Sequence, residues 1–75
     1  MKLSEVKAES QVKVLSLTKD THFLNRILSV GVTEGAELQV VRNDRKMPVL
    51  IYVRETLLAL NRKECEMIEV EVIGA

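Results

Sequence analysis

Short aliphatic segments with a period of two residues constrain this chain more than any other feature of its sequence. The clearest lies at residues 68–73, where Ile and Val alternate with Glu. Such alternation indicates a half-buried β-strand, because successive side chains of a strand point to opposite faces. We therefore expect Ile68, Val70 and Val72 to point inward from a strand over this segment.

Four further segments have the composition of strands and are separated by turn-forming residues. They are rich in Val, Leu and Ile and span residues 11–17, 38–41, 49–53 and 57–60. Five short strands with tight connections in 75 residues favour a small antiparallel barrel, closed or nearly closed, since closure removes exposed edges. With one Phe, one Tyr and no Trp, the core must be aliphatic.

A short helix is expected after the first strand. An i, i+1, i+4, i+5 spacing covers one helical face with Phe23, Leu24, Ile27 and Leu28. Cap-forming residues at 18–21 precede this stripe, and Gly31 can take the left-handed conformation that ends a helix. A single helical turn is expected at residues 62–67, and the polar run 43–46 predicts an exposed hairpin tip.

The sequence offers no constellation for catalysis or for metal or cofactor binding. Its one histidine, His22, lies in no nucleophile motif, and no CxxC or HxxxH spacing occurs. The three glycines are too scattered for a phosphate-binding loop. Cys65 stands between Glu64 and Glu66, which would raise a thiol pKa, so we expect an inert and partly buried cysteine. We therefore predict a protein that is not an enzyme and holds no metal or cofactor.

Charge and composition leave protein binding as the leading function and nucleic-acid binding as the alternative. Eleven Lys+Arg balance eleven Asp+Glu, so no net field attracts nucleic acid or anionic lipid. A local basic patch would consist of Arg42, Arg45, Lys46 and Arg54 together with Arg62 and Lys63, but the interspersed acidic residues favour a mixed surface. Two large aromatic residues are too few for base stacking, however. The single cysteine, and the lack of a signal-peptide pattern or an apolar window of about 20 residues, predict a cytoplasmic protein outside the membrane.

Residues 26–35 resemble the signature region of the FeoA family, small proteins of the bacterial ferrous-iron uptake system. The resemblance continues, in the family's order, at Leu3-Ser4-Glu5-Val6, Pro48-Val49, Leu58-Ala59-Leu60 and Ile68-Glu69-Val70. The chain departs from the family at Glu34, where proline is frequent, and at residues 8–10, where a Pro-Gly turn is usual. It also carries Glu55 where glycine is frequent and Asn61 in place of arginine.

The resemblance implies a mainly all-β, SH3-like barrel in which residues 1–75 form one domain. It further implies an accessory protein that contacts the cytosolic G-protein region of the FeoB permease, with transition-metal binding as a family-level association. The apolar stripe is wider than a one-turn cap on a barrel needs, and Phe23 and Ile27 suit the core. We therefore expect Leu24 and Leu28 to face the partner, with Arg26 making an ionic contact at the rim.

Overall fold

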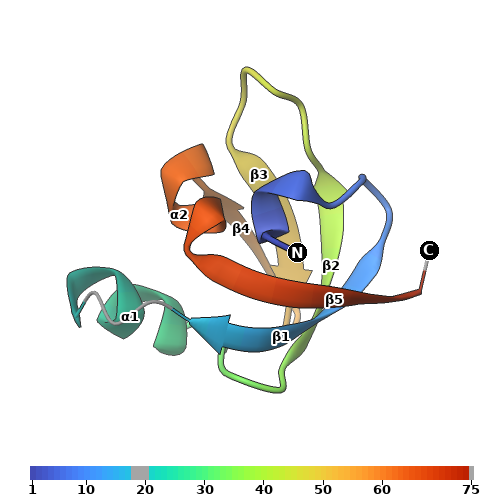
Figure 1. Ribbon diagram of the computed structural model, residues 1–75. Helices are drawn as coiled ribbons and strands as arrows, with labels where there is room; N and C mark the ends of the chain where they lie inside the picture. The colour runs from blue at the N-terminus through green and yellow to red at the C-terminus, as the bar shows by residue number, and fades with distance from the viewer. Residues whose placement is uncertain (18–20, 75) are drawn as a thin grey trace.

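The computed structural model describes residues 1–17 and 21–74, apart from the side chains of Thr21, Phe23 and Leu24. In chain order its elements are η1 (Leu3–Glu5), β1 (Gln11–Leu17), α1 (Thr21–Leu28), β2 (Glu37–Arg42), β3 (Val49–Val53), β4 (Thr56–Leu60), α2 (Arg62–Glu66) and β5 (Ile68–Gly74) (Figure 1). Within the described residues, the five predicted strands and the helix after the first strand are confirmed. The 3-10 helix η1 was not predicted.

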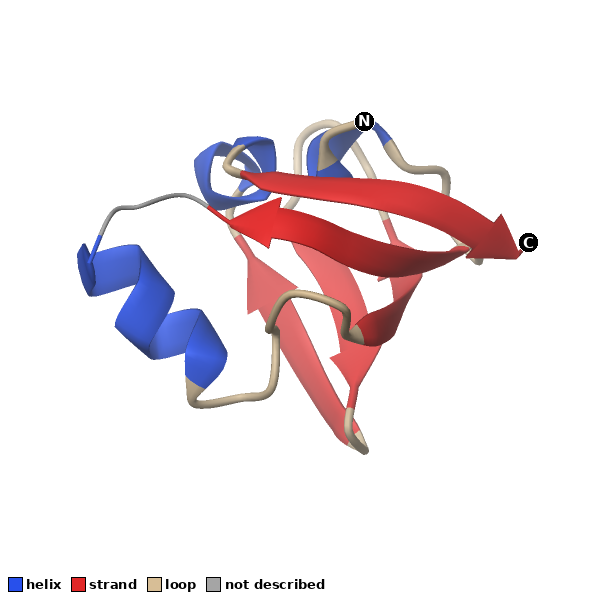
Figure 2. Ribbon diagram, turned by 60° about the horizontal axis from the view of Figure 1, so that its bottom comes forward, coloured by secondary structure: helices blue, strands red, loops and turns tan. Residues whose placement is uncertain are grey.

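The strands form one antiparallel sheet that folds over itself. Across the described residues the strand order is β4-β3-β2-β1-β5, with β4 and β5 at the two edges. Figure 2 shows β1 and β5 lying across β2, β3 and β4, so the sheet forms two layers. This is the nearly closed barrel that the short strands favoured, and its second layer comes from the bent sheet itself.

The core lies between these layers and is aliphatic, as the composition requires. Side chains from both layers are buried, among them Val12 and Val14 of β1, Val40 of β2, Ile51 of β3 and Val70 of β5. Each lies on the inward face of an alternating strand, because side chains two residues apart share a face. At about 25 cal/mol per Å² of buried apolar surface, this burial is the main stabilising contribution to so small a domain.

Helix α1 ends as the sequence predicted, in a left-handed residue. Gly31 has a φ of +97°. The Val32 amide donates to the Ile27 carbonyl at 3.1 Å, and the Gly31 amide donates to the Leu28 carbonyl at 3.1 Å. These two bonds form a Schellman motif, in which a residue beyond the glycine folds back onto the last turn. Ile27 and Val32 are both fully buried, so the motif anchors the helix to the barrel.

Two departures from the family pattern fall on turns with a left-handed backbone. Arg54 and Glu55 join β3 to β4 with φ values of 49° and 64°, as in a type I′ hairpin turn. Glu9 has a φ of 71°, and the Ser10 amide donates to the Lys7 carbonyl at 3.3 Å across that turn. Both turns are therefore made by residues that disfavour the required conformation, where glycine would adopt it without cost.

The prediction that Val72 points into the core is wrong. Val72 pairs with Val12 in the sheet, but it is 49% exposed. Strand β5 lies at the sheet edge, and its C-terminal end extends beyond β2, β3 and β4 (Figures 1 and 2). Its pairing with buried Val12 puts Val72 on the same face of the sheet, but within residues 1–17 and 21–74 this end of β5 is not covered and the side chain stays out of the core.

The prediction of a fully exposed tip at residues 43–46 is wrong for Asn43. Its side chain is half-buried, whereas Asp44, Arg45 and Lys46 are exposed as expected. The Asn43 amide group donates to the Ser4 carbonyl at 3.0 Å and to the Val6 carbonyl at 2.6 Å. Asn43 therefore fastens the N-terminal segment to the hairpin.

Candidate protein-binding surface

Helix α1 is set to one side of the barrel and carries the residues predicted to bind a partner. Figures 1 and 2 both show it beside the end of β1, away from the two layers of strands. Ile27 is fully buried, as expected, and Leu28 next to it is 40% exposed. Leu24 stands one helical turn before Leu28, but its side chain, like that of Phe23, lies outside the described residues. A large apolar side chain is thus available on the outer part of this helix.

Arg26 is exposed, as predicted, but its charge has a partner within the chain. Its Nη1 forms an ion pair with Oε2 of Glu64 in α2. The side chain of Arg26 is 52% exposed, whereas that of Glu64 is 10% exposed. Glu64 Oε1 also accepts a hydrogen bond from the Asn61 amide at 3.1 Å, closing a capping box at the start of α2. Glu64 therefore connects α1 to α2. A partner protein could contact only the solvent-exposed part of the Arg26 side chain.

A second exposed apolar surface lies on the outer face of β3 and β4. Tyr52 and Leu57 are directly opposite each other in the β3–β4 pair, with exposed fractions of 43% and 58%. Paired residues of neighbouring strands lie on the same face, so their side chains are adjacent. The sequence placed both residues in strands, but did not reveal that an apolar pair would remain uncovered on the outside.

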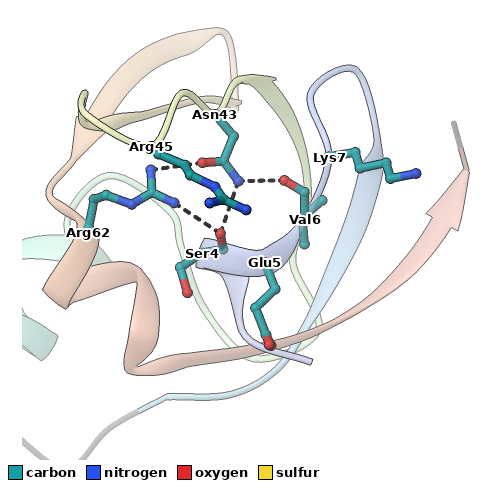
Figure 3. A pocket seen from close by; sticks show the side chains of 7 residues that line it. All are labelled: Ser4, Glu5, Val6, Lys7, Asn43, Arg45 and Arg62. Atoms are coloured by element: carbon teal, nitrogen blue, oxygen red, sulfur yellow. Dashed lines mark hydrogen bonds between the residues drawn. The ribbon is translucent and has the colours of Figure 1, made fainter.

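Arg62 of α2 organises a polar network with the β2–β3 loop and η1 (Figure 3). Its Nη1 donates to Asn43 Oδ1 at 2.8 Å and to the Asp44 carbonyl at 3.0 Å, and its Nη2 donates to the Ser4 carbonyl at 3.2 Å. The guanidinium therefore holds the β2–β3 loop and η1 against α2. All of these acceptors are neutral, so the positive charge of Arg62 is held in place without being cancelled.

Cys65 is a buried structural residue. Its side chain is fully buried in the core, deeper than the partial burial predicted. Burial raises the pKa of the Cys65 thiol to about 12, with Arg62 lowering it and the adjacent Glu64 and Glu66 raising it. The expected direction is confirmed, but loss of hydration is the larger cause and the acidic neighbours the smaller one. A thiol with so high a pKa makes a poor nucleophile or metal ligand.

The metal-ligating side chains of the described residues are dispersed. Within residues 1–17 and 21–74, no three of the His, Cys, Asp and Glu side chains converge as a metal site would require. Helices in this part of the chain are all too short or too polar to cross a membrane.

Sequence reasoning missed the contacts that connect distant segments. Arg26 and Glu64 are 38 residues apart, and Asn43 and Arg62 are 19 apart. No local sequence pattern predicts either contact, because a charged or amide side chain on a short element can equally well be fully exposed to solvent. The one available hint was Asn61-x-x-Glu64, whose spacing is typical of a capping box and would have predicted the start of α2.

Comparison with known proteins points to one family. The family model described as the FeoA domain matches residues 1–72. The FeoA protein from Chlorobium tepidum is 32% identical in a solution structure, with a TM-score of 0.89 over 99% of this chain and 71% of that one. An FeoA-like protein from Clostridium acetobutylicum is 26% identical, with a TM-score of 0.86 over 100% of this chain and 88% of that one.

A third similar structure carries a description of its fold. FeoA from Stenotrophomonas maltophilia, crystallised with zinc and described as a prokaryotic SH3 domain protein, is 25% identical. Its TM-score is 0.81, over 95% of this chain and 89% of that one. The expectation of an SH3-like barrel is thereby confirmed. No curated protein matches the chain.

Proposed function

This chain belongs to the FeoA family, which is linked to ferrous iron transport, and on that premise we propose that it is a non-enzymatic accessory protein of ferrous iron uptake. It works in the cytoplasm by contact with the cytosolic G-protein region of a FeoB-type permease. Residues 1–75 act as one domain in this role. The contact surface is α1, with Leu24 and Leu28 as apolar anchors and Arg26 at the rim.

One observation carries the choice of surface: Leu28 is 40% exposed on a helix that lies at one side of the barrel. Fully burying a leucine side chain is worth roughly 1.5–3 kcal/mol relative to leaving it exposed. An apolar residue beside charged ones is typical of an interface core with a polar rim. Arg26 suits the rim, because its side chain is 52% exposed and its ion pair with Glu64 fixes its position.

Calorimetric titration of the chain into the purified cytosolic G-protein region of a FeoB-type permease tests the proposal. We expect saturable binding that Leu28→Ser weakens roughly fivefold or more, because a central anchor contributes about 1 kcal/mol or more to affinity. Leu57→Ser is the matched control, since Leu57 is an exposed leucine on the outer face of β4. Its binding should match that of the unmodified chain.

Two results would contradict the proposal at different levels. Absence of binding at micromolar concentrations, with the G-protein region in either nucleotide state, would reject the partner. Binding that survives Leu28→Ser but is lost in Leu57→Ser would keep the partner and move the contact to the β3–β4 face.

A titration with mixed oligonucleotides at several salt concentrations distinguishes nucleic-acid binding from the proposed protein binding. Electrostatic binding to phosphates weakens steeply as salt rises, because counterions are released. Affinity with this salt dependence would support the alternative. A missing or salt-independent interaction would remove it.

A further inference from the structure

A cavity of about 360 Å³ opens between the N-terminal segment, the β2–β3 loop and α2. Arg45, Arg62 and Lys7 line it together with the Asn43 amide and the Ser4 and Glu5 residues of η1. In Figure 3 the side chains of Arg45 and Arg62 enter this pocket from the loop and from α2, whereas Lys7 points away from it at the rim. Two elements far apart in sequence thus bring two guanidinium groups into one pocket, with Lys7 at its rim.

The positive charge of this pocket is not neutralised by the residues around it. Among residues 1–17 and 21–74, the ion pairs are those of Met1 with Glu69, Arg26 with Glu64 and Arg42 with Asp44. Arg45, Arg62 and Lys7 take part in none of them. Glu5, the acidic lining residue, accepts a hydrogen bond from the Lys2 amide at 2.8 Å and points away from both guanidinium groups (Figure 3). Like charges that share a pocket repel each other, so an anion placed between them is favoured.

We propose that this pocket binds a phosphate-bearing small molecule between Arg45 and Arg62. Guanidinium groups match the oxygens of a phosphate in paired hydrogen bonds. Both Nη atoms of Arg62 already donate to neutral acceptors on the loop and on η1, so Arg62 contributes a positive charge held in one position. Arg45 on the exposed loop supplies the paired hydrogen bonds. A phosphate group carries close to two negative charges and three acceptor oxygens, which suits two cations from separate elements better than a single carboxylate does.

The lining also indicates which part of the ligand is recognised. None of the seven residues around the pocket is aromatic, so a nucleobase has no ring to stack on. The phosphate, and not an attached base, is therefore the recognised group. The site goes beyond the proposed partner contact, since none of its lining residues belongs to α1.

Titration of the ¹⁵N-labelled chain with pyrophosphate, followed by amide shifts, tests the site at low ionic strength. We expect saturable shifts at residues 4–7, 43–45 and 62, and similar shifts with a nucleoside diphosphate. A nucleoside without phosphate should produce none. Arg45→Glu should weaken pyrophosphate binding roughly fivefold or more, because it replaces an attraction by a repulsion.

Lys46→Glu is the matched control, because it changes the net charge by the same amount at the neighbouring exposed residue, which does not line the pocket. Both substitutions lie on an exposed loop, so folding should be retained. Equal weakening by the two variants would overturn the proposal in favour of a general charge effect. The absence of saturable shifts at the pocket, or tighter binding of citrate than of pyrophosphate, would also overturn it.

Discussion

Gly31→Ala tests whether the exit of α1 depends on backbone conformation or on close packing. Gly31 has a φ of +97°, a conformation that residues with a Cβ rarely adopt. Holding an L-residue in a left-handed conformation costs roughly 1–2 kcal/mol. A Cβ atom at this position would also lie 2.5 Å from Cδ and 2.9 Å from Nε of Arg54, closer than non-bonded atoms approach.

The two effects differ in how easily the protein can relieve them. The Arg54 side chain is exposed and flexible, so it can rotate away from the new methyl group. The backbone of Gly31 cannot relax in the same way, because the Schellman hydrogen bonds to Ile27 and Leu28 hold it. We therefore expect the backbone conformation to account for most of the loss, about 1–2 kcal/mol. For a domain of this size that lowers the Tm by roughly 4–16 °C.

Urea and thermal unfolding of four proteins separate these contributions: the unmodified chain, Gly31→Ala, Arg54→Ala and the double variant. Arg54→Ala alone should change the free energy of unfolding by less than about 0.5 kcal/mol, as for most exposed substitutions. The double variant should remain as unstable as Gly31→Ala, to within about 0.5 kcal/mol. Recovery of most of the lost stability in the double variant would show that the contact with Arg54 dominates and would refute the reasoning.

Three further substitutions test features that the structure revealed. Glu55→Gly should raise the free energy of unfolding by roughly 0.5–1 kcal/mol, because glycine accepts the positive φ of the β3–β4 turn; Glu55→Ala keeps the Cβ, and an equal gain in its thermal unfolding would contradict this explanation. Burial raises the pKa of the Cys65 thiol from 9.0 to about 12. Between these two pH values the folded chain therefore retains a thiol proton that the unfolded chain loses. The contribution of this thiol to the free energy of unfolding is fully present below pH 9 and falls by up to about 1.4 kcal/mol per pH unit above it. In urea unfolding, the free energy of unfolding of Cys65→Ala should therefore decline less steeply with pH than that of the unmodified chain. Asn43→Ala should cost about 1–3 kcal/mol, because it removes two hydrogen bonds to the N-terminal segment. Asn43→Asp retains the acceptor for Arg62 but loses both donors, and unchanged chemical denaturation of these two variants would rule out the fastening role.

The candidate site was predicted only in part. The apolar stripe is wider than a cap on the barrel needs, which predicted Ile27 in the core and Leu28 outside it; Ile27 is fully buried and Leu28 is 40% exposed. Helical spacing placed Arg26 on the outside, but could not reveal its ion pair with Glu64 in α2. The outward apolar pair Tyr52 and Leu57 also escaped prediction, since alternation shows which residues share a face but not whether that face is covered.

By itself, the sequence determined the strands, the helix between the first two of them and the left-handed exit at Gly31. These features depend on periodicity and on the conformational preferences of single residues, which act over a few neighbouring positions. Only the tertiary structure decided that Val72 lies beyond the second layer and that Asn43 is half-buried beneath the hairpin tip. Tertiary packing also brought Arg45 and Arg62 to one pocket. Burial and charge pairing of this kind depend on which distant segments meet, and that is settled when the sheet bends and its layers pack.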